Sequence, residues 1–125
     1  MNKDSKIFLA GSTGMVGSAI LRELKKSSFT NIITPDSKQL NLLNQLEVEK
    51  FFEDTKPDYI FCAAAKVGGI YANDKFSADF IYENIQIQNN LIHSSMKNNI
   101  KKFLFLGSSC IYPRESKQPI KEEYL

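Results

Sequence analysis

Residues 104–115, "LFLGSSCIYPRE", carry an apolar run directly into a loop of reactive side chains. The hydroxyl of Ser108 can donate a hydrogen bond to an oxygen that gains negative charge during a reaction. The thiol of Cys110 can act as an acid or a base if its pKa lies close to the working pH. Ser109 is a competing serine, which could simply satisfy backbone groups at the end of a strand. The segment therefore predicts either an active site or an ordinary turn.

A second candidate site is the loop in which Gly11, Gly14 and Gly17 form the pattern G-x-x-G-x-x-G. In such a loop one glycine permits the tight turn, another lets the backbone approach a diphosphate, and a third lets a helix pack on a strand. Free N–H groups at the start of the helix favour the negative charge of the phosphate. The loop stands between an expected strand and an expected helix, which is the context of a dinucleotide site, although such glycines could simply cap the helix.

The elements that must position these residues alternate along the chain. Asn44 is a good N-cap, and Glu47 stands three residues later in the capping-box position. Ile81, Ile85, Ile92 and Met96 form one side of a long helix. Apolar runs predict strands at 6–11, 31–34, 58–65 and 101–109, and the patterns between them predict helices at 15–27, 45–55 and 79–99, with a loop at 66–78.

This alternation predicts an α/β fold with a doubly wound parallel sheet of the Rossmann type, covered by helices on both faces. Counted along the chain, the expected strand order is 3-2-1-4, with the chain direction reversing between the first and the fourth strand. Ligands bind beyond the carboxyl ends of the strands at such a point. We therefore expect the glycine loop and the loop containing Ser108 to meet in one crevice.

The residues after the second strand bear on the choice of dinucleotide. An acidic residue about 20 positions beyond the glycines binds the ribose hydroxyls and favours NAD, and Asp36 is near that place. Lys38 could instead meet a 2′-phosphate, and Lys66 could attract a phosphate beside the crevice. Each of these charges could also be merely solvated.

Three stretches carry a more specific signal: "AAAKVGGIYAND" (63–74), "ADFIYENIQIQNNLIH" (78–93) and "KKFLFLGSSCIYP" (101–113). They closely resemble the GDP-L-fucose synthase family of the extended short-chain dehydrogenase/reductase superfamily, and the resemblance runs from about Lys6 to Leu125. It implies an oxidoreductase and isomerase of nucleotide-sugar biosynthesis. That activity is the NADPH-dependent 3,5-epimerisation and 4-reduction of GDP-4-keto-6-deoxy-D-mannose to GDP-L-fucose. The implied cofactor is NADP, with NAD as the alternative.

By this resemblance the catalytic serine falls on Ser108 and the epimerisation cysteine on Cys110. Tyr112 follows Ser108 at the S-x-x-x-Y spacing of related enzymes. Basic residues that are common in members preferring NADPH are missing here, where Thr13, Pro35 and Ser37 stand, and this leaves Lys38 as the local candidate for the 2′-phosphate. No metal is implied. The implied cofactor contacts are Gly11, Ser12, Thr13, Gly14, Met15, Val16, Gly17, Asp36, Ser37, Lys38, Leu40, Asn41, Ala63, Ala64, Ala65, Leu106 and Gly107.

The superfamily also uses a Tyr-x-x-x-Lys pair for reduction, which in the family follows the serine segment. Tyr71 and Lys75 have this spacing but precede that segment, so we interpret them as a coincidence. We therefore expect residues 1–125 to be the amino-terminal part of an NAD(P)-binding Rossmann domain, without the substrate domain and inactive alone. The alternatives are a non-catalytic NAD(P)-binding sensor or partner module and one subunit of a split sugar-nucleotide epimerase/reductase.

The composition of the chain limits which classes of partner are expected. The chain of 125 residues is 42% apolar and 24% charged, and its net charge of +2 is too small to favour nucleic acid or a membrane surface. The start of the chain does not resemble a signal peptide, and the two cysteines suggest no disulfide framework. We expect a soluble cytoplasmic protein that acts on a GDP-sugar when whole. Its expected partners are a second copy or a complementing carboxy-terminal half.

Overall fold

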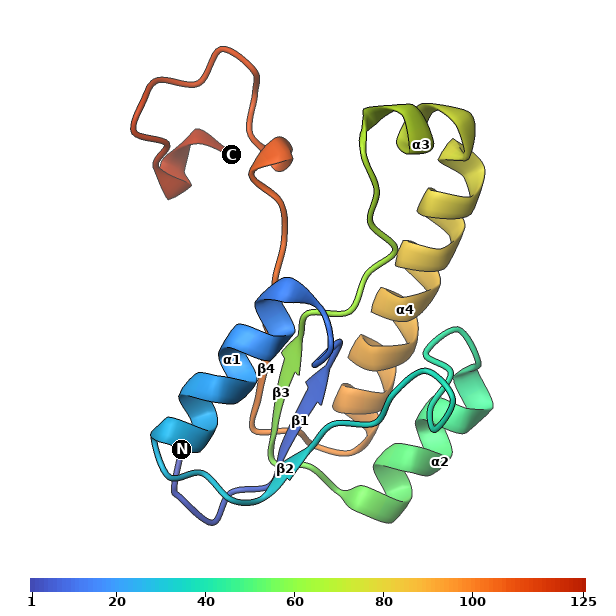
Figure 1. The fold of residues 1–125 in the computed structure, drawn as a ribbon, viewed down its shortest axis with the longest axis vertical. Coiled ribbons are helices and arrows are strands. Elements are labelled where there is room, and N and C mark those ends of the chain that lie inside the picture. The colour runs from blue at the N-terminus through green and yellow to red at the C-terminus, as the bar shows by residue number, and fades with distance from the viewer.

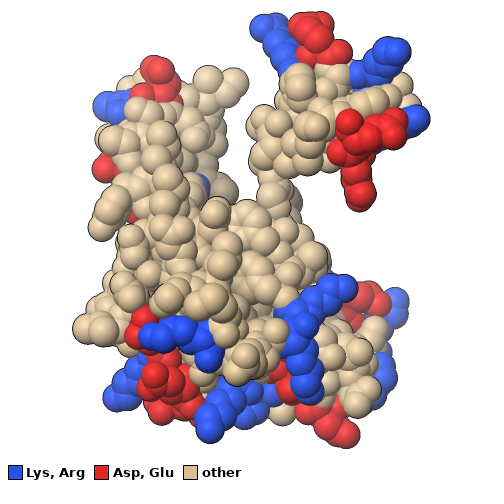
Figure 2. Space-filling model, turned by 180° about the vertical axis from the view of Figure 1, so that it is seen from behind, with Lys and Arg blue, Asp and Glu red and all other residues tan.

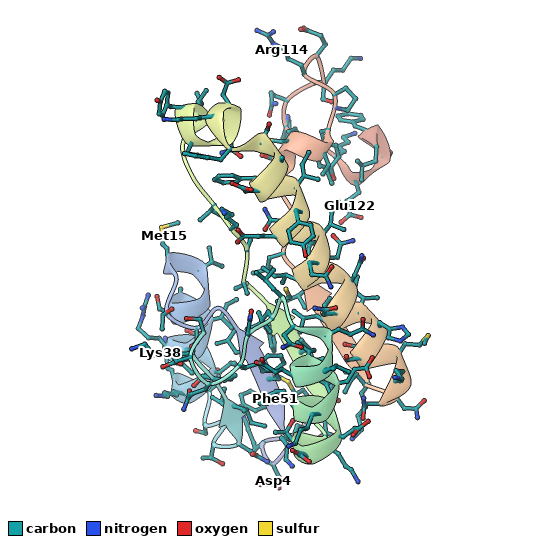
Figure 3. All side chains as sticks on the ribbon, turned by 90° about the vertical axis from the view of Figure 1, so that its right-hand side faces the viewer. Asp4, Met15, Lys38, Phe51, Arg114 and Glu122 are labelled. Carbon is teal, nitrogen blue, oxygen red and sulfur yellow. The ribbon has the colours of Figure 1, made fainter.

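The apolar runs form one parallel sheet in the computed structural model, which describes residues 1–125. The strands are shorter than the runs that predict them: β1 (Ile7–Ala10), β2 (Ile32–Ile33), β3 (Tyr59–Cys62) and β4 (Lys102–Phe105). Helix α1 (Met15–Lys26) covers one face of the sheet, and α2 (Gln45–Thr55) and α4 (Ser77–Lys97) cover the other (Figures 1 and 3). The doubly wound α/β fold is thus confirmed.

The order of the strands is β2-β1-β3-β4, which differs from the expected 3-2-1-4. Ile7 of β1 pairs with Ile32 on one side and with Tyr59 on the other, and β4 pairs with β3. The reason is that residues 34–44 form turns where the usual order has a further strand beside β2. The third strand of the chain therefore crosses to the far side of β1. The chain direction reverses between β1 and β3, and the crevice lies there.

The helix boundaries follow their local signals. Asn44 accepts hydrogen bonds from the N–H groups of Leu46 (3.1 Å) and Glu47 (3.3 Å), and its side-chain amide donates to Glu47 (2.8 Å). The predicted cap of α2 is therefore confirmed. The prediction of a loop over 66–78 is wrong in its second half, because α3 (Ile70–Lys75) forms there and leads into α4. Gly68 and Gly69 stand just before α3, with Gly69 as its N-cap, so these glycines favour a loop only at the start of the range.

Ile81, Ile85, Ile92 and Met96 do lie on one side of α4, but it is the side away from the sheet, where they are 46–66% exposed. The side against the sheet carries Phe80 and Leu91 together with buried polar residues: Asn90, Ser94 and Ser95. The rear view in Figure 2 shows a middle region almost without charged side chains. None of the helices combines the length and the apolar character that a membrane-spanning helix needs.

The core lies between the sheet and the pair α2 and α4. Phe8 of β1 meets two aromatic rings of α2, with centroid distances of 5.0 Å to Phe51 and 5.8 Å to Phe52. Phe8 and Phe52 are fully buried. Leu40, from the loop before α2, reaches the same cluster and is 4% exposed. This cluster forms the floor beneath the carboxyl ends of β1 and β3.

Asp58 connects the amino-terminal ends of β1, β3 and β4, and we expect its carboxylate to make the stability of the chain depend on pH. It pairs with the ammonium group of Lys101 (2.7 Å) and accepts a hydrogen bond from the N–H group of Lys6 (2.9 Å). These two contacts lower the pKa of Asp58 from its ordinary value of 3.8. A lowered folded-state pKa adds stability above the ordinary value, and this stability is lost as the pH falls through the folded-state pKa.

The Asp58→Asn variant should therefore have a lower urea midpoint than the wild type at pH 7, and the difference should shrink as the pH falls below about 4. The asparagine oxygen can still accept from Lys6, so the variant tests the charge. Asp54→Asn is the control, because Asp54 is exposed and has no ion pair. If the urea midpoints of Asp58→Asn and the wild type differ by the same amount at pH 7 and at pH 3, the carboxylate charge of Asp58 is not the source of the pH dependence.

Candidate dinucleotide site

A cavity of about 760 Å³ lies at the carboxyl ends of β1 and β3, the place that the strand order predicts for a ligand. Its walls come from the glycine loop, the segment after β2, the segment after β3, and α4. Its residues are Phe8, Ala10, Gly11, Ser12, Thr13, Gly14, Met15, Val16, Pro35, Asp36, Ser37, Leu40, Asn41, Leu42, Leu43, Ala63, Ala64, Ala65, Lys66, Val67, Glu83 and Ile87.

Most of the residues predicted to contact a cofactor line this cavity, and four do not. Gly17 lies behind the loop, where it packs on the backbone of Gly11. Lys38 is exposed at the surface (labelled in Figure 3) and is absent from the lining. Leu106 and Gly107 follow β4 and are separated from β1 by β3.

The glycine loop is held by close backbone contacts that leave no room for a side chain at two of its three glycines. Gly11 has a φ of +80°, and a Cβ there would stand 2.7 Å from the backbone of Ala63. A Cβ on Gly17 would stand 2.0 Å from the carbonyl oxygen of Gly11. Gly14 is the N-cap of α1, and a Cβ there would have a single neighbour within 4 Å, the carbonyl oxygen of Gly11 at 3.5 Å. The loop thus presents backbone and the N-terminus of α1, where N–H groups lack intrahelical partners, to the cavity.

The segment after β2 is shaped by Asp36. One oxygen of its carboxylate accepts hydrogen bonds from the N–H groups of Lys38 (2.8 Å) and Gln39 (3.0 Å). The carboxylate therefore holds the turn and also lines the cavity, at the position where an acidic residue can meet the ribose of a dinucleotide. The cavity lining on this side contains no basic residue.

The segment after β3 is fixed to α4 through Lys66. Its N–H group donates to the side-chain oxygen of Asn84 (2.8 Å), and its carbonyl oxygen accepts from the amide of Asn84 (2.9 Å). The ammonium group of Lys66 pairs with Glu83. Lys66 is therefore neither free nor merely solvated.

Three of the side chains that hold these walls were missed by the sequence analysis: Glu83, Asn84 and Asn90. The spacing of residues 84, 87, 90 and 91 could have indicated two of them, because these positions share one side of a helix. The side-chain amides of Asn84 and Asn90 on that side must find hydrogen-bond partners when buried.

The loop containing Ser108 lies apart from the cavity. Ser108 accepts a hydrogen bond from the N–H group of Cys110 (3.1 Å) and caps the short 3₁₀ helix Ser109–Ile111. Ser108 and Cys110 are exposed, and Cys110 lines a smaller hollow of about 450 Å³ together with Tyr112. The glycine loop and this loop therefore do not line one cavity, because β3 lies between β1 and β4.

The two cysteines have different surroundings. Cys62 is 2% exposed in β3, and burial raises the pKa of its thiol, so it packs as a neutral side chain. Cys110 is exposed, and neither cysteine is bonded to another. No group of His, Cys, Asp or Glu side chains is arranged to hold a metal ion.

Comparison with known proteins agrees with this geometry. GDP-L-fucose synthase 1 of Arabidopsis thaliana is 53% identical over 124 residues, which are 99% of this chain and 38% of that protein. The structure of a GDP-mannoheptose C4 reductase from Campylobacter jejuni with NADP bound is 47% identical, with a TM-score of 0.93, over 100% of this chain and 40% of that one. A GDP-L-fucose synthetase from Naegleria fowleri bound to NADP is 29% identical with a TM-score of 0.86, over 100% and 40%.

The chain thus spans about 38% of the length of the GDP-L-fucose synthase of Arabidopsis thaliana that it matches. The strands, the glycine loop and the residues that line the cavity all lie within residues 7–125. The profile of the NAD dependent epimerase/dehydratase family matches residues 7–125, and the chain belongs to that family.

Proposed function

We propose that the cavity binds NADP and that residues 1–125 form the amino-terminal, cofactor-binding part of a GDP-L-fucose synthase-like enzyme. The observation that carries this proposal is the glycine loop, which has no room for a side chain at Gly11 and Gly17 and turns the N-terminus of α1 toward the cavity. Support also comes from relatives whose structures contain NADP. The diphosphate would lie over Gly14, and the adenosine ribose would lie near Asp36.

The whole enzyme would convert GDP-4-keto-6-deoxy-D-mannose to GDP-L-fucose. Bound NADPH would supply the hydride that reduces the ketone at carbon 4. Ser108 is suited to donate a hydrogen bond to the ketone oxygen, because it is an exposed residue just after β4 and its hydroxyl only accepts in its bond with Cys110. That bond stabilises negative charge on the oxygen and makes the neighbouring C–H protons easier to remove. Cys110, two residues on and also exposed, is suited to exchange those protons during inversion.

A partner segment would complete this chemistry. Leu104, Phe105 and Leu106 at the β4 edge are 38–45% exposed, although they are apolar. Such an edge favours pairing with a further strand and its helix. We propose that the carboxy-terminal part of the enzyme, in the same chain or as a complementing half, covers this edge, and that the protein works in the cytoplasm.

The proposal predicts that the 125-residue chain binds NADP without turning over GDP-4-keto-6-deoxymannose. Binding requires the glycine loop, which is present, whereas reduction requires the Tyr-x-x-x-Lys pair, which we find only as the displaced Tyr71 and Lys75. Isothermal titration with NADP and NAD measures the first, and NADPH consumption with the GDP-sugar measures the second. If neither NADP nor NAD binds, the cofactor proposal is refuted. If the 125-residue chain alone turns over the GDP-sugar, the proposal that reduction needs a further segment is refuted.

A further inference from the structure

The cavity wall after β2, residues 36–43, contains no helix or strand, so its position depends on individual contacts. Most of its hydrogen bonds are local. Asp36 holds its own turn, and the N–H group of Asn41 donates to Glu47 at the start of α2 (3.1 Å). These bonds set the shape of the segment. They do not fix its distance from the opposite wall of the cavity.

One hydrogen bond connects this wall to a distant part of the fold. The side-chain amide of Asn90, on α4, donates to the carbonyl oxygen of Leu42 (2.8 Å). The side-chain oxygen of Asn90 in turn accepts from Gln86 one turn earlier (2.9 Å). Leu42 lines the cavity, and Leu40 beside it adds an apolar anchor in the core. The Asn90 bond is therefore the polar contact that places the segment relative to α4.

The burial of Asn90 makes this contact significant. The residue is only 3% exposed, on the side of α4 that packs against the sheet. Burying an amide is costly unless it is hydrogen-bonded, and a leucine would fill the same place without that cost. A helix that merely needed to pack would therefore be served better by an apolar residue. The amide satisfies a carbonyl group that has no strand partner.

The same helix holds the opposite wall. Asn84, six positions earlier, forms its two hydrogen bonds with the backbone of Lys66 after β3. Ile87 lies between the two asparagines and lines the cavity itself. Residues three positions apart fall on the same side of a helix, so α4 reaches both walls from one side. Figure 1 shows α4 running along the sheet past both segments.

We infer that Asn90 is a positioning residue for the adenosine side of the dinucleotide site, and that α4 sets the separation of the two cavity walls. This inference rests on the proposed function, because the adenosine is assigned to the wall after β2 by the position of Asp36. Asn90 touches Leu42 rather than the cofactor. Its effect on binding would be transmitted through the backbone of that segment.

The test compares Asn90→Leu with Asn84→Leu and with Asn89→Leu, whose asparagine is exposed on the same helix. The probes are AMP, which carries only the adenosine half, and NADP. Asn90→Leu should weaken the binding of both probes about fivefold, as expected for one lost buried hydrogen bond. Asn84→Leu should weaken NADP binding and leave AMP binding within about twofold. Asn89→Leu should bind both probes like the wild type.

Amide hydrogen exchange without ligand provides a second measurement. Asn90→Leu should increase exchange in residues 36–43 and leave the N–H group of Lys66 protected, whereas Asn84→Leu should do the reverse. Unaltered AMP binding in Asn90→Leu, or equal loss in both variants, would overturn the inference. If the wild type binds neither probe, the proposed function fails. The exchange data then decide alone, and unchanged exchange in 36–43 of Asn90→Leu would reject the positioning role.

Discussion

Replacing Gly17 by alanine is expected to destabilise the chain by about 3 kcal/mol and to abolish dinucleotide binding. The new Cβ would stand 2.0 Å from the carbonyl oxygen of Gly11 and 2.7 Å from its carbonyl carbon. Both atoms are backbone, so a rotation of a side chain cannot relieve the overlap. Either α1 must move away from β1 or the loop must change its path. Gly17 does not line the cavity, so any loss of binding would follow from this displacement.

Gly14→Ala is the matched variant for this experiment. A Cβ at Gly14 would have a single neighbour at 3.5 Å, which is ordinary contact, and the residue already has a φ of −71°. Its stability should fall by about 1 kcal/mol or less, as for an alanine at a helix N-cap. Its binding should still weaken about tenfold, because the methyl group would face the diphosphate. Urea unfolding and NADP titration of both variants measure the two effects, and a Gly17→Ala protein as stable as the wild type would contradict this account.

Replacing Phe52 by alanine is the second change with a large expected effect, a loss of about 3–5 kcal/mol. Phe52 is fully buried and meets the ring of Phe8 edge to face, with planes at 86°. The cavity left behind would remove support from Phe8, which lines the ligand cavity. Since domains of this size are stable by only about 5–15 kcal/mol, much of the total would be lost.

The comparison for Phe52→Ala is Phe76→Ala. Phe76 is 46% exposed at the start of α4, so its replacement should cost about 1 kcal/mol or less. Urea midpoints with unchanged slopes would give the two differences directly. Similar midpoints for the two variants would mean that the cluster of Phe8, Phe51 and Phe52 is not the centre of the core.

Local signals predicted most of the fold because they act within a few residues. Asn44 caps the start of α2, and the observed helix has the predicted ends. The glycine spacing likewise predicted a loop between β1 and α1, and Gly11 and Gly17 are in contact there. These features depend on backbone geometry that a short stretch of sequence determines by itself.

Long-range arrangement was harder to predict. The predicted strand order was wrong because no sequence signal in residues 34–44 indicates that this segment forms turns instead of a further strand beside β2. The same error gave the glycine loop the wrong neighbour. The segment beside it is the one after β3, at Ala63, and not the Ser108 segment after β4. The orientation of α4 was missed for a related reason. Its apolar stripe at Ile81 and Ile85 looks like a core face, whereas the buried side depends on carbonyl groups that only the folded chain brings near Asn90.

The pairing of β1 also bears on how the chain folds. Ile7 pairs with Tyr59, and Tyr59 pairs with Lys102, so the sheet joins segments that are far apart along the chain. Closing such long loops has an entropic cost before any contact is gained, and proteins rich in distant contacts fold in roughly milliseconds to seconds rather than microseconds. Ribosomal synthesis delivers β1 before β2 and β3, and β1 cannot pair on both sides until β3 has emerged. During that interval the apolar strand Ile7–Ala10 would lie exposed, which makes early chaperone contact an expected part of its biogenesis.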